Sequence, residues 1–363
     1  MIIRHIIKMT SLLVGMALLL VVVIAGGLVY CNDPPTQALV VPEEDETLRI
    51  ETDGTVSLEV RSGESAWSVG RRLEAARIIK TRYFWYFLSR LDKEYIKTGI
   101  YRLALPATQV AIHATLVAGR QPLIKVTIPE GVTLKKTARI LAESAICTEA
   151  DFLASATDQE IIAAYQVPGL TMEGYLYPDT YLFPRTYPAA QVVKTMADTF
   201  FRRIAELPDS SGDTGSTALD MPPEALFRRV IIASIVEREY RVDEEAALMA
   251  GVFYNRLKIG MALQSCATVE YVITEIQGKP HPEVLYTRDT EIQDPYNTYM
   301  RTGLPPGPIA SPGAVALNAA FNPLPSEYLY FRLVDADAGR HYFSKTLDDH
   351  IKAGALYVKR RVP

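Results

Sequence analysis

Glu237 is the residue of this sequence best placed to act as a general acid. It follows the largely apolar run VIIASIV at positions 230–236. A carboxyl group among Ile and Val side chains loses hydration, which disfavours its charged form and raises its pKa toward neutrality, as proton donation requires. A glutamate at the end of a helix can equally face solvent. The rest of the sequence has to decide between a catalytic and a surface carboxyl group.

A helix over about residues 222–240 would carry Glu237. Asp220 can cap its start, and the two prolines and the glutamate that open it are favourable in a first turn. Both Glu237 and Glu239 follow an apolar residue one turn back, so periodicity does not choose between them. A second helix is expected over about residues 242–257, because its acidic first turn complements the helix dipole.

The N-terminal segment predicts a membrane-spanning helix over residues 9–31. After Arg4 and Lys8 no charge appears until Asp33. Residues 9–32, as a helix, would reach about 36 Å at ~1.5 Å per residue, enough to cross a bilayer core of about 30 Å. Because both cations precede the apolar run, residues 1–8 should stay in the cytoplasm. The sequence therefore predicts a single-pass membrane protein, exported from the linker onward.

Two other interpretations of this segment stay open. The small residues at positions 25–27 could form the cleavage site of a signal peptide, although the apolar run continues past them. Cys31 could carry a lipid, although Tyr30 stands where a small residue is expected. The uncleaved anchor fits the pattern best.

Composition excludes several classes of function. The exported part carries 36 Lys and Arg residues against 42 Asp and Glu, a net charge of about −6, which argues against a nucleic-acid partner. Only Cys147 and Cys266 lie outside the anchor region, too few for a disulfide framework. The five histidines show no metal-ligand spacing, and GxSxG, GxGxxG and Walker-type loops are missing. We expect no metal and no cofactor.

The exported part has an internal repeat, and its pattern predicts an α+β fold. Each copy reads as a short strand, a turn at Gly, a hydroxyl residue that can cap a helix, and an amphipathic helix. The unit resembles a LysM module, the small β-α-α-β fold that binds N-acetylated glycans, although a generic α+β element has the same pattern. Trp67 and the aromatic residues 83–87 could stack on sugars or fill the core. The two copies are Val60, Gly63, Ser65, Leu73 and Ile78, and Ile128, Gly131, Thr133, Leu141 and Ile146.

Changes in composition suggest the domain boundaries. Pro and acidic residues predict a solvated linker, and a stretch of Pro, Gly, Ser and Asp predicts a second linker or loop. The expected order is a linker at 32–47, a LysM-like domain at 48–125, a second α+β subdomain at 126–206, a linker or loop at 207–221, and a mixed α+β catalytic domain at 222–363.

Several ordered motifs make the chain similar to the endolytic murein transglycosylase family, also called MltG or YceG-like. They span most of the chain from about Val60 onward. Relatives often have Asp-Pro where this chain has Cys266 and Ala267, which puts the role of that loop in doubt. The motifs are EGYLYPDTY at 173–181, ASIVERE at 233–239, FYNRL at 253–257, GMALQ at 260–264, YNTY at 296–299 and GLPPGPI at 303–309.

The resemblance implies a lyase that cuts the β-1,4 bond between N-acetylmuramic acid and N-acetylglucosamine within glycan strands, leaving 1,6-anhydro ends. It makes Glu237 the catalytic residue, acting first as acid and then as base. Most hydrolytic glycosidases need two carboxylates, and the sequence offers no second one with a defined role. Gln264, Thr268, Tyr296 and Asn297 are expected to bind sugar groups, and Glu173 to support the site.

Peptidoglycan strands are the implied substrate, and peptidoglycan synthases the implied partners. Two alternatives remain from the sequence alone. One is a muramidase that hydrolyses the same bond. The other is a catalytically silent, membrane-anchored scaffold that binds glycan for the wall-synthesis machinery.

Overall fold

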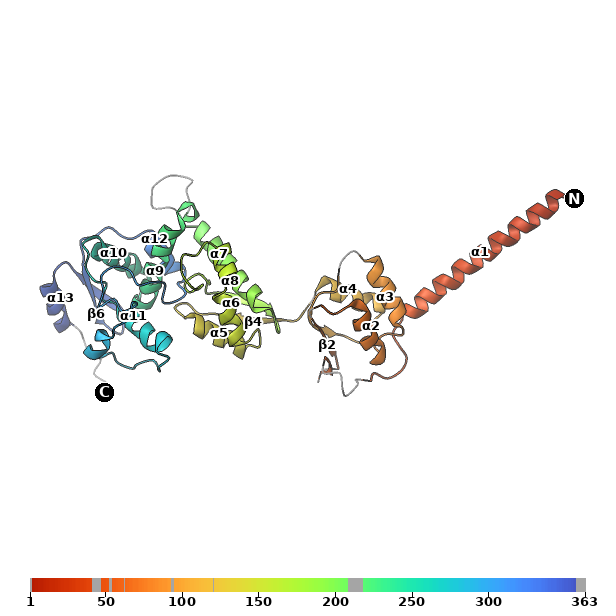
Figure 1. The fold of residues 1–363 in the computed structure, drawn as a ribbon, viewed down its shortest axis with the longest axis horizontal. Coiled ribbons are helices and arrows are strands. Elements are labelled where there is room, and N and C mark those ends of the chain that lie inside the picture. Colours follow the sequence, from red (N-terminus) through yellow and green to blue (C-terminus); the bar gives the residue numbers. More distant parts are fainter. Residues whose placement is uncertain are drawn as a thin grey trace. The chain divides into compact units, whose positions relative to one another are not determined.

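The computed structural model describes residues 2–40, 47–51, 54–61, 63–92, 95–119, 121–207 and 218–356. The chain divides into two compact units (Figure 1). The first unit comprises Met1–Ile124 with Pro184–Thr186, and the second comprises Lys125–Phe183 with Tyr187–Pro363. The second unit therefore holds both segments that the sequence analysis separates at 207–221. The acidic cluster at 43–46 and the loop at 208–217 lie outside the described residues.

Helix α1 (Ile2–Asn32) opens the first unit. Its part Leu13–Asn32 has a mean hydropathy of 2.6 and is long and apolar enough to cross a membrane. The sequence predicts a solvated linker from residue 32, and the structure differs as far as the chain is described. Leu39 packs against the core of the first unit, and the Val40 N–H donates to the Ala76 carbonyl at 3.2 Å. This apolar contact and backbone pairing hold the segment on the protein.

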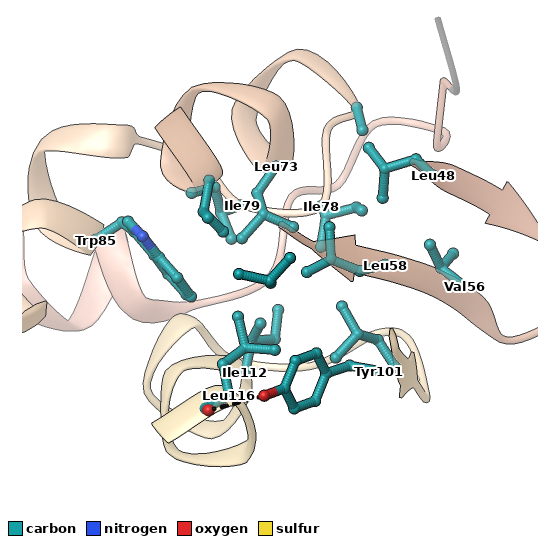
Figure 2. Close-up of a cluster of buried hydrophobic side chains, with 14 residues drawn as sticks. Leu48, Val56, Leu58, Leu73, Ile78, Ile79, Trp85, Tyr101, Ile112 and Leu116 are labelled. Carbon is teal, nitrogen blue, oxygen red and sulfur yellow. Dashed lines mark hydrogen bonds between the residues drawn. The ribbon is translucent and has the colours of Figure 1, made fainter. Parts of the chain in front are cut away.

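The first unit is a three-stranded antiparallel sheet covered by helices. In the sheet, β2 is central, between β1 and β3. Alternate residues of β2 are buried, so one face of the sheet forms the core with the helices, as Figure 2 shows around Leu73, Trp85 and Ile112. The elements are β1 (Leu48–Ile50), β2 (Val56–Val60), α2 (Ala66–Ala75), α3 (Arg82–Leu91), β3 (Gly99–Leu103) and α4 (Gln109–Ala118).

The second unit is mostly helical, with two small two-stranded sheets, β4–β5 and β6–β7. Together the two units confirm the mixed α+β class. The elements from β4 onward are β4 (Leu123–Thr127), α5 (Leu134–Glu143), α6 (Glu149–Ala156), α7 (Gln159–Ala164), β5 (Thr180–Pro184), α8 (Ala189–Ala205), η1 (Ala218–Asp220), α9 (Pro223–Glu239), α10 (Asp243–Lys258), α11 (Cys266–Tyr271), η2 (Val272–Ile276), η3 (Thr287–Glu291), α12 (Ala314–Phe321), β6 (Tyr330–Asp335), β7 (Arg340–Ser344), α13 (Leu347–Ala353) and η4 (Gly354–Leu356).

The repeat in the sequence is also a repeat in structure. Gly63 and Gly131 turn the chain with φ of 75° and 71°, in the left-handed region that favours glycine. Two residues later Ser65 and Thr133 cap α2 and α5, each accepting from the backbone N–H three residues on, at 3.2 and 3.3 Å. Each copy thus encodes the same turn and helix start.

The two copies also end their first helices alike. Arg77 and Ala145 take positive φ values of 56° and 54°. The next residue in each copy, Ile78 or Ile146, is buried, and its N–H donates to the carbonyl of the buried leucine five residues earlier, at 2.9 and 3.0 Å. This is a left-handed helix end closed by an apolar contact. Copy one continues as β2-α2-α3-β3, and copy two as β4-α5-α6-α7-β5.

Candidate active site

Helix α9 brings Glu237 to the site. It begins at Pro223, and the N-cap residue is Pro222 and not the expected Asp220. Asp220 instead ends the short helix η1, two residues before the N-cap. Residues 230–236 of α9 are all buried, because α10, α11 and α12 pack around this helix. A helix covered on several sides needs apolar residues all round, which explains the run that precedes Glu237.

The carboxyl group of Glu237 is held by a glycine N–H. The helix ends where Tyr240 becomes extended, so Glu237 lies half-buried in the last turn. The Gly313 N–H, at the start of α12, donates to Glu237 Oε2 at 2.9 Å. On another side lies the turn of the second repeat, where a β-carbon on Gly131 would come 3.6 Å from Glu237 Cγ. Small residues therefore leave room around this carboxyl group.

Burial raises the pKa of Glu237 to about 7. The Gly313 N–H opposes this shift because it stabilises the carboxylate, while the negative charges of Glu130 and Asp243 add to it. The end of a helix is also the negative end of its dipole, which disfavours a second negative charge. Near neutral pH, Glu237 can therefore both give and take a proton.

Glu130 is a second carboxyl group beside Glu237, and sequence reasoning missed it. Its side chain is exposed, and its carboxyl group lies against Gly313, where a β-carbon built on that glycine would overlap it. The available signal is the repeat itself, because Glu130 directly precedes the turn glycine, where the first copy has Ser62. The charged residue thus marks a position at which two otherwise similar turns differ.

The loop that carries Gly313 is hydrogen-bonded both to α9, which carries Glu237, and to the turn of the second repeat. The Ile309 N–H donates to Ser234 Oγ of α9 at 3.0 Å. Gly131 N–H donates to the Ser311 carbonyl at 2.9 Å, and Ser311 N–H donates to the Val132 carbonyl at 2.8 Å. Three segments far apart in sequence therefore converge on one carboxyl group.

Glu239 lies in a different setting from Glu237. Its carboxyl group accepts from the Ser265 hydroxyl, and burial raises its pKa while the hydrogen bonds from Ser265 and the Ala267 N–H lower it. Residues two apart on a helix point to opposite sides, at about 100° per residue. Tertiary structure thus separates two glutamates that periodicity could not.

Glu173 supports the turn of the second repeat. Its side chain is only 5% exposed, and both carboxyl oxygens lie 3.1 Å from the N–H of Leu134, the first residue of α5. Burial raises its pKa to about 8, although the Leu134 N–H lowers it. Glu173 thus binds the start of the helix that follows Gly131.

Thr268 and Asn297 are internal, which differs from their expected contact with sugars. Both residues are fully buried. Thr268 Oγ1 donates to the Ser265 carbonyl at 2.7 Å and lies 2.9 Å from Thr298 Oγ1. Asn297 Nδ2 donates to the carbonyls of Thr290 and Ile292 at 2.9 and 2.8 Å. Their polar atoms bind the backbone and side chains of neighbouring loops.

Gln264 and Tyr296 remain accessible. Gln264 is exposed with φ of 51° and lines an open cavity of about 490 Å³ together with Glu239 and Cys266. Tyr296 is half-buried, and its ring centroid lies 5.0 Å from that of Tyr271. Glu237 is not among the residues that line this cavity.

Cys266 lies at the start of α11, beside Tyr299. Its Sγ lies 3.1 Å from the Tyr299 hydroxyl, and burial raises its pKa, so the thiol is neutral. Among the residues that the structure describes, no group of three or more His, Cys, Asp or Glu side chains could hold a metal ion.

Comparison with known proteins extends the similarity over most of the chain. The sequence profile of the YceG-like family matches residues 58–355. A Bacillus subtilis protein named endolytic murein transglycosylase is 29% identical over 334 residues, which cover 87% of this chain and 88% of that protein. A Streptococcus pneumoniae protein of the same name is 28% identical over 340 residues, which cover 85% of this chain and 59% of that protein.

A solved structure is similar as well. The crystal structure of a yceG-like protein from Listeria monocytogenes superposes with a TM-score of 0.53 at 31% identity. The match covers 82% of this chain and 98% of that one. Motifs, family profile and fold thus agree.

Proposed function

This chain belongs to the YceG-like family, and on that premise we propose that it is an endolytic murein transglycosylase. Such a lyase cuts the β-1,4 bond between N-acetylmuramic acid and N-acetylglucosamine inside glycan strands. One observation carries the catalytic assignment. The half-buried carboxyl group of Glu237 has its pKa raised to about 7, within the motif ASIVERE. That pKa suits a residue that must first donate and then accept a proton.

The reaction has two proton transfers through Glu237. The protonated carboxyl group gives its proton to the glycosidic oxygen as the bond from muramyl C1 to that oxygen breaks, releasing N-acetylglucosamine with a free 4-hydroxyl. The resulting carboxylate then takes the proton of the muramyl C6 hydroxyl as O6 bonds to C1. This closes the 1,6-anhydro ring without water and restores the acid. The Gly313 N–H stabilises the carboxylate between the two transfers.

The neighbouring carboxyl groups support this cycle. The charges of Glu130 and Asp243 raise the pKa of Glu237 and so favour its protonated form before the substrate is cleaved. Glu173, bound to the start of α5, is proposed to fix the turn that contains Gly131 beside Glu237. Neither effect requires contact between these side chains and the substrate.

Among the predicted binding residues, we assign sugar contacts to Gln264 and Tyr296, whose side chains are at least partly accessible. Thr268 and Asn297 are assigned to hold the loops 265–268 and 290–299, since both are buried and hydrogen-bonded. Their loss would therefore displace the binding loops without removing a direct contact.

The organisation proposed for the rest of the chain follows the sequence analysis. Helix α1 anchors the protein in the inner membrane as a single pass, with both units on the outer side of that membrane. The order β2-α2-α3-β3 in the first unit supports a LysM-like fold that binds N-acetylated glycans. An anchor this close to the first unit suits cleavage of nascent strands, which would limit their length, with peptidoglycan synthases as partners.

A muramidase is the second candidate, because Glu130 offers the second carboxyl group that hydrolysis would use. Product analysis separates the functions. The full-length protein in detergent is incubated with uncrosslinked glycan strands in water enriched in ¹⁸O, and the products are identified by mass spectrometry. Anhydro ends without ¹⁸O support the transglycosylase. Reducing ends with ¹⁸O would identify the hydrolase, and unchanged strands would favour the non-catalytic scaffold.

A further inference from the structure

Helix α3 of the first unit is apolar on two opposite faces. Its inner face holds Trp85, which is fully buried and donates from Nε1 to the Ala66 carbonyl at 2.9 Å. Its outer face carries Tyr83, Phe87 and Leu91, which are 66%, 48% and 65% exposed. Their spacing of four residues puts them in one stripe along the helix. A surface helix normally turns polar residues outward, so this stripe needs an apolar partner.

The stripe lies on a helix that contacts the end of α1. Helices α3 and α4 both pack against α1. Lys80, just before α3, donates from Nζ to the Tyr30 carbonyl at 2.9 Å and lies 4.0 Å from the Tyr30 ring centroid. At the start of α4, Gln109 Nε2 donates to the Cys31 carbonyl at 2.7 Å.

A further hydrogen bond completes this attachment, from the Val110 N–H to Asn32 Oδ1 at 3.0 Å. The last carbonyls of a helix have no partner within it, so these bonds satisfy groups that would otherwise need water. These contacts therefore fasten α3 and α4 directly to the end of α1. If α1 ends at a membrane surface, α3 lies at that surface too.

We propose that Tyr83, Phe87 and Leu91 rest in the interfacial layer of the bilayer that α1 crosses. This inference rests on the proposed membrane anchoring of α1. Tyr and Phe rings suit the boundary between headgroups and acyl chains, and an apolar helix face parallel to it removes area from water. Arg90, exposed next to Leu91, suits the phosphates of lipid headgroups.

The stripe favours lipid over sugar as its partner. Stacking on sugars uses the flat faces of aromatic rings, and Leu91 has none. The aliphatic and aromatic side chains instead share only their lack of charge, which an acyl layer accepts in any orientation. Helix α3 also contacts α1, an apolar helix that is itself exposed over residues 13–30. The first unit would thus lie on the membrane surface in a fixed orientation.

Trp67 allows a direct test. Its ring packs edge-on against Tyr83 with centroids 5.6 Å apart, whereas the other tryptophan, Trp85, is buried. The full chain is reconstituted in vesicles that contain lipids with a nitroxide at headgroup depth, which quenches nearby fluorescence. Comparison with the Trp67→Phe protein isolates the Trp67 emission. A ring at headgroup depth should lose more of that emission as the share of nitroxide lipid rises.

Variants show whether the stripe is responsible. Tyr83→Ser combined with Phe87→Ser should restore most of the Trp67 emission. A control with Leu170→Ser and Val284→Ser, which removes exposed apolar side chains from the second unit, should be quenched like the unchanged protein. Thermal unfolding checks that each variant is folded.

Three results would overturn the inference. Unquenched Trp67 in protein that resists alkaline extraction from the vesicles would refute the lipid contact and leave the anchor intact. Trp67 emission that responds to soluble glycan strands but not to nitroxide lipids would identify a sugar surface. Extraction of the whole protein by alkali would refute the anchor and the lipid contact together.

Discussion

The turns of the two repeats have the same local structure but different surroundings. In the first copy the turn closes on itself. Glu64 accepts from the Arg61 N–H at 3.2 Å and pairs with Arg72 of α2 at 2.9 Å, and a β-carbon on Gly63 would meet no atom within 4 Å. In the second copy the turn bonds outward, to the loop at Ser311 and to Glu173. The same turn and helix start thus forms a self-contained module in the first copy and one side of a candidate active site in the second.

This difference shows that the surroundings of Glu237 come from segments packed around the second turn and not from the turn itself. Both copies share the positive-φ glycine, the hydroxyl cap and the left-handed helix end. Only the second copy has a carboxyl group of another helix packed beside its glycine. Paired variants, one in each copy, can therefore separate what the turn does for folding from what it does for activity.

The largest expected effect removes the carboxyl group that distinguishes the second turn. Glu237→Gln keeps size and a hydrogen-bond acceptor for the Gly313 N–H but cannot transfer a proton. We expect the rate of anhydro-end formation to fall by about 10³-fold, within the range for loss of a general acid. The melting temperature should not fall, because a neutral side chain is less costly to bury. Anhydro ends at the normal rate would refute the assignment.

The next comparison places a methyl group at both glycines. Gly63→Ala and Gly131→Ala each force alanine into a positive φ, which costs about 1–2 kcal/mol of unfolding free energy. Because the backbone strain is the same, denaturant unfolding should show similar losses of unfolding free energy in the two variants. Only the methyl group at position 131 stands beside Glu237, so only this variant should cleave glycan several-fold more slowly. Equal losses of activity in the two variants would show that the second turn has no special effect on Glu237.

The helix caps should behave alike in the two copies. Ser65→Ala and Thr133→Ala each remove an acceptor for a backbone N–H at a helix start, worth about 1 kcal/mol. Urea unfolding measures this loss, and Thr133→Ser, which keeps the hydroxyl, should recover most of it. If removing the cap left the unfolding free energy unchanged in one copy, the two helix starts would not be equivalent.

The smallest effect concerns the charge at the second turn. Glu130→Gln removes a negative charge that raises the pKa of Glu237, so that pKa falls. A general acid works in its protonated form, and kcat/KM should therefore decline at a lower pH in the variant. We expect less than a tenfold loss above about pH 7 and little change near pH 5. Glu64→Gln, at the first turn, should leave the profile unchanged, and a shift to higher pH in Glu130→Gln would contradict the prediction.

Much of the fold near the site could be predicted from the sequence. The helices expected at 222–240 and 242–257 are Pro223–Glu239 and Asp243–Lys258 in the structure. The aromatic cluster was ambiguous, because only packing decides that Trp85 points inward while Tyr83 and Phe87 point outward. Thr268 and Asn297 lie in motifs rich in polar residues, and sequence gives no sign of whether such side chains meet a ligand or one another.

The sequence by itself determined the repeat, its turns and caps, the apolar N-terminal helix, and the apolar run that precedes Glu237. These features depend on residues within about one or two turns of each other, so they can be recognised along the chain. Only the tertiary structure decided that Gly313, 76 positions away, donates to Glu237, and that Glu130 lies beside them. Such pairs form when separate segments pack together, and no local pattern records which segments those are.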